Sequence, residues 1–393
     1  MNLRFDQTPL LPTAFAPRTE PLNLQRRFGA WAGYRTALCY GDPEMEYAAI
    51  RNTAMLYDLC PMTKYLISGV HAEDYLQRLT LRNIKKLSAG GVHYTAWTDD
   101  AGKVLDDGTL FRTGREDFML CCQERHLPWF LDSAQGFEVQ VRDATETIAA
   151  ISLQGPVSAT VLAAAGFDVS TLKPFRLTHL SFETGKTIIS RTGFTGDLGY
   201  ELWTTPDLAL PLWDRLMGAG LPLGLRPAGS DALNLARIES SFLIATIDFI
   251  PAHQALREDR TRSPFELGFG WMVDFDKGHF TGRRALLRER DTGSNWARVG
   301  LDIPGNVAAQ GAILYHAKKH EVGHITSAAW SPITKRNVAL AEIEAKHADG
   351  RDIWVEIYAE RELRYAKLML PVTVVERPFF NPARKRATPP ERF

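Results

Sequence analysis

The sequence predicts an α+β protein with a separate all-β domain near its C-terminus. Helix and strand signals alternate without a fixed repeat as far as residue 285, and short strands with almost no helix follow from residue 290. The length of 393 residues suits two or three domains, and 45% hydrophobic with 23% charged residues is a globular composition. We therefore predict an N-terminal region over 1–285, a β-barrel-like domain over 290–378 and a basic, loosely held tail over 379–393.

The balance of charges argues against one class of partner. The chain has 46 Lys and Arg residues against 46 Asp and Glu residues, so its formal net charge is zero. Nucleic-acid-binding proteins normally carry a basic excess. We predict no nucleic-acid partner, although a local arginine could still hold an anionic small molecule.

The chain has no recognisable membrane or export signal. No apolar run approaches the roughly 20 residues of a membrane span, and the N-terminal stretch "MNLRFDQTPLLPTAFAPRTEP" lacks the apolar core of a signal peptide. The four cysteines show no CxxC pair and no metal-ligand spacing, so we interpret them as reduced thiols. The sequence thus predicts a cytoplasmic protein without a membrane partner.

The N-terminal region can be divided into elements in chain order. Asp42 and Pro43 supply an N-cap and a first-turn proline for the helix "DPEMEYAAIRN". Two strands joined by the polar turn 113–117 are predicted in "KVLDDGTLFRTGREDFMLCCQ", and "IAAISLQGPVSATVLAAAG" predicts a buried strand, a break and a helix. A glycine-rich loop joins two strands in "KTIISRTGFTGDLGYELWTT". The segments "PDLALPLWDRLMGAG" and "GSDALNLARIESSF" have the pattern of amphipathic helices.

Four aspartates gather between residues 99 and 107. They lack the alternating ligands and closing glutamate of a calcium loop, so we predict no metal site. Asp99 and Asp100 lie in "DDAG", which is typical of a hairpin turn. Asp106 and Asp107 enter a strand, where one of two neighbours faces inward. An enclosed carboxylate has a raised pKa or a specific partner, so this pair is either a functional group or an ordinary part of the strand.

The stretch "RTGFTGDLGYELW" contains three glycines, and Glu201 follows the last of them by two positions. It is neither a Walker loop nor a GxGxxG turn before a helix. Two interpretations remain open, a tight β-turn or a backbone that approaches a flat ligand. In the second, a buried Glu201 would accept two N–H bonds from a 2-amino-4-oxo pyrimidine ring, an edge that guanine and pterin share.

Five motifs together resemble one known family. They are, in chain order, "YTAWTDDAGKVLDDGTLF", "SLQGP", "RTGFTGDLGYELW", "SPFELGFGWMVDFDKGHFTGRRAL" and "GHITSAAWSP". Their order and spacing resemble the aminomethyltransferase (glycine-cleavage T-protein) family, over residues 22–378. The resemblance implies a tetrahydrofolate-dependent one-carbon (methyl) transferase. It also implies a three-lobed cloverleaf with folate in a central channel, in which region 1–285 forms two interleaved α+β lobes before the C-terminal barrel.

The resemblance assigns residues to the cofactor. Glu201 falls on the family's pterin-binding glutamate, and Phe194 stands where the family has a tyrosine. Arg237 falls on the later of two conserved positions in the following helix, whereas Leu233 occupies the earlier arginine position. We therefore expect Glu201, Phe194 and Arg237 to contact the folate.

A second group of residues follows from the same resemblance. Asp107 falls on the family's active-site aspartate, and Tyr94, thirteen positions earlier, falls on its channel tyrosine. Phe111 and Gln123 fall on a strand aromatic and on an asparagine that bind the cofactor. Asp107 is expected to position folate nitrogens or a water.

The stretch "DDGTLF", with "FGAWAGYRTALCYGD" and "LCCQERHLPWF", resembles the O-demethylases of methoxylated aromatic acids within this family. The resemblance places Tyr34 and Arg125 in the substrate pocket, but a further tyrosine of that branch would fall near Phe249 or Ile250. It implies a small carboxylate-bearing methyl donor, 5-methyltetrahydrofolate as the product and no lipoyl carrier protein. Tyr34 or Tyr94 would donate a proton to the departing oxygen, and Arg125 would hold the carboxylate.

Other functions of the same fold stay open at this point. One is aminomethyl transfer, and another is demethylation of dimethylglycine or of a sulfonium acid. A sulfonium or a quaternary amine leaves as a neutral group and needs no acid. A third is a non-catalytic folate-binding assembly factor. Those proteins carry a cysteine where this chain has "ATIDFIPAHQA", which disfavours the third alternative.

Overall fold

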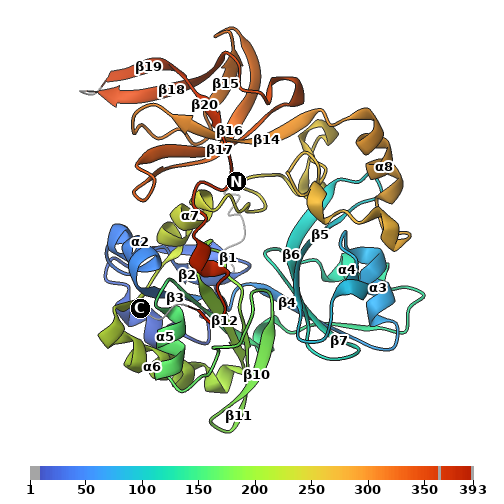
Figure 1. The fold of residues 1–393 in the computed structure, drawn as a ribbon, viewed down its shortest axis with the longest axis vertical. Helices are drawn as coiled ribbons and strands as arrows, with labels where there is room; N and C mark the ends of the chain where they lie inside the picture. The colour runs from blue at the N-terminus through green and yellow to red at the C-terminus, as the bar shows by residue number, and fades with distance from the viewer. Residues whose placement is uncertain (1–8, 362–363, 391–393) are drawn as a thin grey trace, which may run out of the picture. The chain divides into compact units, whose positions relative to one another are not determined.

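The computed structural model describes residues 9–361 and 364–390 (Figure 1). The chain divides into two compact units. The first unit comprises the described residues up to 65, residues 142–234 and the residues from 383 onward. The second comprises residues 66–141 and 235–382. Each unit is therefore built from separate segments of the chain.

The first unit contains a six-stranded sheet of strand order β10-β11-β12-β9-β3-β13. All neighbours are antiparallel except β13 and β3, which are parallel. Every residue of β9 is buried, so this strand is covered on both faces. The hydrophobic core of the unit contains residues of β9 and of the helices α5 and α6. The bounds are β3 Ala54–Asp58, β9 Ala149–Gln154, β10 Leu177–Phe182, β11 Gly185–Ser190, β12 Gly199–Thr204, β13 Leu225–Pro227, α5 Ser158–Ala164 and α6 Ala209–Gly220.

The helix α2 (Pro43–Asn52) begins where the sequence predicts. The Asp42 side chain accepts backbone N–H bonds from Glu44 and Met45, and Pro43 occupies the first turn. Because both features satisfy or remove unpaired donors at a helix start, they fix this boundary. A hairpin of β1 (Phe28–Trp31) and β2 (Tyr34–Ala37) precedes the helix.

The second unit carries the strands of the predicted aspartate site and the late β domain. The strands β5 (Val92–Thr98), β6 (Val104–Arg112) and β7 (Asp117–Cys122) are consecutive neighbours in a sheet of order β5-β6-β7-β4-β8. The late β domain is a seven-stranded sheet of order β19-β18-β15-β16-β17-β14-β20 around its own apolar core. Its bounds are β14 Trp296–Ile303, β15 Ile313–His316, β16 His320–Ser331, β17 Arg336–Glu344, β18 Ile353–Arg361, β19 Arg364–Pro371 and β20 Thr373–Val375.

Several shorter elements complete the fold. The helices are α1 Ala16–Thr19, α3 Ala72–Leu79, α4 Leu127–Ser133, α7 Ser230–Glu239 and α8 Arg283–Thr292, and the remaining strands are β4 Thr63–Ser68 and β8 Gln140–Asp143. A 3₁₀ turn, η11, covers Ala383–Lys385 in the segment that we expected to be loosely held. That expectation is wrong for residues 383–388, because Arg191 and Asp197 of the first unit make hydrogen bonds to this segment.

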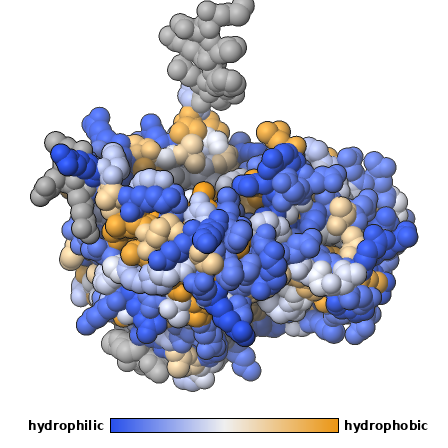
Figure 2. Space-filling view, turned by 90° about the horizontal axis from the view of Figure 1, so that it is seen from above, coloured by the Kyte–Doolittle hydropathy of each residue, from blue (hydrophilic) through white to orange (hydrophobic). Residues whose placement is uncertain are grey.

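No helix in residues 9–361 and 364–390 combines the length and the apolar character needed to span a membrane. The face drawn in Figure 2 is mostly hydrophilic, with hydrophobic residues in small groups. Four free cysteines, Cys39, Cys60, Cys121 and Cys122, are buried.

Candidate functional site

Tyr94 and Asp107 form a direct contact within the second unit. The Tyr94 hydroxyl donates a hydrogen bond of 2.7 Å to Oδ2 of Asp107. Tyr94 on β5 lies opposite Thr109 on β6, so Asp107 is its diagonal neighbour on the same face of the sheet. The antiparallel register thus brings together the two residues that the sequence analysis paired.

The surroundings of this pair raise the pKa values of both side chains. Burial raises the pKa of Asp107 well above the usual carboxyl range, the neighbouring Asp106 raises it further, and the hydrogen bond from Tyr94 partly offsets both effects. Burial and then Asp107 raise the pKa of Tyr94 well above its ordinary value. Tyr94 therefore keeps its proton, and Asp107 is the member of the pair that can change protonation state near neutral pH.

An aromatic surface that sequence reasoning missed adjoins Tyr94. The Tyr94 ring packs edge-on against Phe269 at 5.8 Å and lies 6.4 Å from Trp271. Trp271 is 63% exposed, and the Arg82 guanidinium lies over its ring, 5.4 Å from the ring centre. The exposed part of such an indole can pack against a flat ligand ring. Its signal was present in the motif "GFGWMV", which the sequence analysis quoted without assigning Trp271 a role.

Asp106 points to the opposite side of the strand and has a different partner. Its carboxylate is fully buried, and Oδ2 lies 2.9 Å from Nε2 of His126. It also accepts backbone N–H bonds from Asp107 at 2.8 Å and Glu124 at 3.3 Å. Burial raises the pKa of Asp106 and lowers that of His126 to about 4. The pair therefore anchors the turn that follows β7, where Gln123 and Arg125 lie.

We expect His126→Ala to destabilise the protein by about 2–4 kcal/mol, because it leaves the buried Asp106 carboxyl without its side-chain partner. Urea unfolding followed by fluorescence measures the loss. His253→Ala, which removes the exposed neighbouring ring 5.1 Å away, is the matched control and should cost less than 1 kcal/mol. Equal losses of unfolding free energy in the two variants would show that the Asp106–His126 pair stabilises the protein no more than an exposed ring does.

The remaining predicted residues of the second unit differ in exposure. Gln123 donates from Nε2 to the Ala245 carbonyl at 3.3 Å and is partly exposed, and Arg125 is exposed two residues later. Phe111 has no exposed area, so its ring packs inside the unit. Arg237 is 1% exposed and donates to Asp248 at 2.5 Å and to Ser327 at 2.8 Å. The structure thus gives Phe111 and Arg237 packing and ion-pair roles, and their contacts with a cofactor stay predictions.

Glu201 belongs to the first unit, on β12 beside β11 and β9. Its Oε2 accepts a hydrogen bond of 2.5 Å from the Thr192 hydroxyl, and the residue is 7% exposed. Burial raises the pKa of Glu201 to about 7, and the Thr192 bond partly opposes that shift. Such an acceptor suits the N–H donors of a pterin, because further hydrogen bonds to the ionised form would offset its burial.

Gln154 explains Gly193, in the loop between β11 and β12, and Gly199, the first residue of β12. Its Nε2 donates to the carbonyls of Thr192 at 3.1 Å and Tyr200 at 3.3 Å. A Cβ at Gly193 or Gly199 would lie 2.0 Å from Oε1 of Gln154. These glycines therefore make room for an internal side chain, and close approach of a ligand is not needed to explain them. Gln154 is the glutamine of "SLQGP", a motif to which the sequence analysis gave no role.

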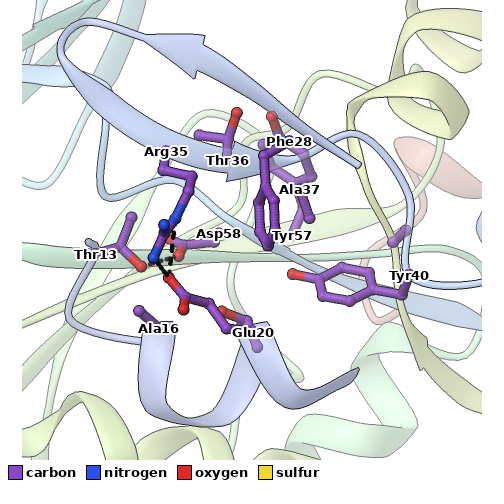
Figure 3. Close-up of a pocket in the computed structure, with 12 residues that line it drawn as sticks. Thr13, Ala16, Glu20, Phe28, Arg35, Thr36, Ala37, Tyr40, Tyr57 and Asp58 are labelled. Carbon is purple, nitrogen blue, oxygen red and sulfur yellow. Dashed lines mark hydrogen bonds and ion pairs between the residues drawn. The ribbon is translucent and has the colours of Figure 1, made fainter. Parts of the chain in front are cut away.

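The cavity drawn in Figure 3 lies in the first unit and is lined by polar and aromatic residues. Arg35 pairs there with Glu20, and the Thr13 hydroxyl donates to Asp58 at 2.5 Å. Its volume of about 20 Å³ is sufficient for one or two water molecules and too small for a methyl donor. Tyr34, which we expected in a substrate pocket, is 6% exposed and is not among the lining residues.

Comparison with known proteins places the chain in a family. The family model of the GCVT N-terminal domain matches residues 22–277, and that of the glycine cleavage T-protein C-terminal barrel domain matches residues 297–381. The chain belongs to the aminomethyltransferase family. An aminomethyltransferase of Caldanaerobacter subterraneus subsp. tengcongensis is 30% identical over 335 residues, which are 83% of this chain and 87% of that protein.

Two further relatives extend the comparison. A trimethylamine-oxide aldolase of Ruegeria pomeroyi is 32% identical over 376 residues, which cover 91% of this chain but only 46% of that protein. The crystal structure of the glycine cleavage system aminomethyltransferase T from Bartonella henselae matches with a TM-score of 0.84 at 24% identity, covering 95% of this chain and 99% of that one.

These matches confirm the predicted fold class, an α+β T-protein fold with a C-terminal barrel-like domain. They also confirm membership of the aminomethyltransferase family, tetrahydrofolate as the cofactor and one-carbon transfer as the class of enzyme. The predicted domain boundaries and the roles of individual residues remain predictions.

Proposed function

We propose that this aminomethyltransferase-family enzyme moves a methyl group from a small carboxylate-bearing donor to tetrahydrofolate, giving 5-methyltetrahydrofolate. An O-methylated aromatic acid is the favoured donor. The observation that carries this proposal is the raised pKa of Asp107 beside Tyr94. A neutral ether needs a proton on its departing oxygen, and a carboxyl that is protonated near neutral pH can supply one.

Each proposed role follows from the contacts of one side chain. Tetrahydrofolate, when bound, supplies N5 as the acceptor of the one-carbon unit. Glu201 holds the pterin through its buried carboxylate, and Thr192 fixes one of its oxygens. Phe194, half-buried in the same loop, packs against the ring, and the partly exposed Gln123 offers an amide. Gln154 donates to the Thr192 carbonyl of this loop and to the Tyr200 carbonyl of β12, and so ties the loop to the sheet.

Asp107 is the proposed proton donor to the departing oxygen. Tyr94 donates to Oδ2, so it orients the carboxyl and cannot itself give up its proton easily, since its pKa is raised by burial and by Asp107. The sequence instead led us to expect that Tyr34 or Tyr94 donates this proton and that Asp107 positions folate nitrogens or a water, and that alternative also stays a prediction. Holding acceptor, methyl carbon and departing atom in line would supply much of the remaining rate enhancement.

Arg125 and Tyr34 are proposed for donor binding. Arg125 lies in the turn between β7 and α4, and its exposed guanidinium can bind a carboxylate with two parallel hydrogen bonds. Tyr34 would supply a hydroxyl after a local rearrangement, because it is 6% exposed.

A second candidate function is aminomethyl transfer or demethylation of an amine or sulfonium donor. Relatives named aminomethyltransferase and trimethylamine-oxide aldolase favour it. An ammonium or sulfonium donor gives up its methyl group and departs as a neutral amine or sulfide, so no acid is needed. Asp107 would then act as a base that takes the proton lost from N5 on methylation. In aminomethyl transfer the product would be methylenetetrahydrofolate, and a lipoyl carrier protein would be a partner.

A product assay separates these candidates. Purified protein would be incubated with tetrahydrofolate and, in turn, with methoxylated benzoic acids, dimethylglycine, a dimethylsulfonium acid and an aminomethylated lipoyl carrier. We expect 5-methyltetrahydrofolate with the methoxylated acids, identified by its mass. Methylenetetrahydrofolate formed only with the lipoyl carrier would overturn the proposal in favour of the second candidate.

A further inference from the structure

A segment of residues 383–388, which we call the C-terminal clasp, binds the loop 191–199 of the first unit. Arg384 donates from Nε to Oδ1 of Asp197 at 2.7 Å and from Nη2 to Oδ2 at 2.6 Å. The Asp197 side chain has no exposed area. A bidentate pair of this kind fixes the orientation of both groups, so the clasp determines where Asp197 can lie.

The clasp also binds the first residue of this loop. Arg191 is 4% exposed, and its Nη2 donates to the Ala387 carbonyl at 2.7 Å and to the Lys385 carbonyl at 3.2 Å. Its Nη1 donates to the Thr388 hydroxyl at 2.9 Å. Arg191 directly precedes Thr192, whose hydroxyl donates to Glu201.

A third arginine connects these contacts. Arg51 is 3% exposed, donates from Nη1 to the Thr195 carbonyl at 2.8 Å, and lies 3.9 Å from Asp197. Arg384 in turn donates from Nη2 to the Arg51 carbonyl at 3.2 Å. Because buried charges are stable only when all are paired, loss of Arg384 would force Asp197 and Arg51 to rearrange together. Both hold the loop that contains Thr192.

We propose that the C-terminal clasp positions the loop 191–199 for cofactor binding, with Arg384 as the principal positioning residue. The inference rests on the proposed role of Glu201 in binding the pterin. Thr192 orients the Glu201 carboxylate from this loop, and displacement of a binding group by about 1 Å can cost a hundredfold in function. The clasp therefore acts on tetrahydrofolate affinity and not on the methyl donor.

Substitutions at Arg384 test the proposal. Arg384→Ala should raise the Kd and KM for tetrahydrofolate about tenfold or more, and leave kcat and the KM for the donor nearly unchanged. Arg384→Lys should restore only part of the affinity, because lysine cannot make the two-bond contact. Arg386→Ala, which removes the same charge from an exposed position of the clasp, is the matched control and should bind as the unaltered protein does. Calorimetric titration gives Kd, and thermal unfolding reports whether each variant is folded.

The outcomes for Glu201 and Arg384 distinguish the two proposals. If Glu201→Gln weakens binding and Arg384→Ala does not, the clasp proposal is wrong and the role of Glu201 stands. If Glu201→Gln has no effect, the proposed role of Glu201 fails whatever Arg384 does.

A measurement on the unaltered protein covers the case in which Arg384→Ala does not fold. Coupling between two sites is reciprocal, so tetrahydrofolate should slow trypsin cleavage after Arg384, Lys385 and Arg386 by the same mechanism. Cleavage at an unchanged rate in saturating tetrahydrofolate would count against the proposal.

Discussion

Replacing Glu201 with glutamine is expected to weaken tetrahydrofolate binding by about 100-fold or more. Hydrogen bonds to a charged group contribute about 1.5–3 kcal/mol each, and the pterin edge offers two donors to one carboxylate. Glutamine keeps one acceptor but turns an N–H group toward the donors of the ring. Calorimetric titration measures Kd, and Glu146→Gln, an exposed change in the same unit, serves as the control. An unchanged Kd would mean that Glu201 does not contact the cofactor.

The same site predicts a pH dependence of binding. Burial raises the pKa of Glu201 to about 7 in the free protein, and the bound pterin would favour the carboxylate and lower that pKa. Binding therefore releases a proton below pH 7. Affinity should be constant at higher pH and fall by up to about tenfold for each pH unit below 7. Glu201→Gln should remove this slope, whereas affinity that improves on acidification would contradict the assignment.

Replacing Asp107 with asparagine is expected to lower kcat for an O-methyl donor by about 10²–10⁴-fold, the usual contribution of a general acid. The Kd for tetrahydrofolate should change little, since Glu201 carries that interaction. The substitution is nearly isosteric and keeps an acceptor for the Tyr94 hydroxyl, so thermal unfolding should confirm an intact fold. Turnover equal to that of the unaltered enzyme would exclude Asp107 as the acid.

The pH dependence of the rate distinguishes whether Asp107 acts as an acid or as a base. If Asp107 acts as an acid, the rate falls as pH rises through its raised pKa, and Asp107→Asn abolishes this descending limb. Tyr94→Phe removes a donor that lowers the pKa of Asp107, so the limb should move to higher pH. A rate that instead increases with pH through this region would indicate a base, and with it an ammonium or sulfonium donor.

The sequence was sufficient to predict contacts that local strand geometry determines. Tyr94 and Asp107 are thirteen residues apart on adjacent antiparallel strands, so the short connection between the strands fixes their contact. Glu201 follows from a motif on a single strand. For these residues, a motif and the two-residue period of a strand are sufficient to predict which strand carries each side chain and which residue lies beside it.

Contacts that depend on tertiary packing were not predicted. His126 meets Asp106 only because the turn after β7 folds back, and Arg384 meets Asp197 across 187 positions of the chain. Phe111 and Arg237 were matched by residue type, but the position of a residue in a motif does not determine its exposed area. Both residues are buried by packing within the second unit, and no local pattern in the sequence predicts that packing.

The discontinuity of the first unit has a consequence for the synthesis of the protein. Its loop 191–199 leaves the ribosome long before Arg384, and residues 235–382 of the second unit are made in between. The Asp197 carboxylate therefore cannot make its two-bond contact with Arg384 until residue 384 has been synthesised, whereas a domain built from one continuous segment can complete its contacts earlier in translation. Chains released before residue 384 would keep all of loop 191–199 and lack Arg384, so the proposed role of the C-terminal clasp predicts that premature termination impairs cofactor binding.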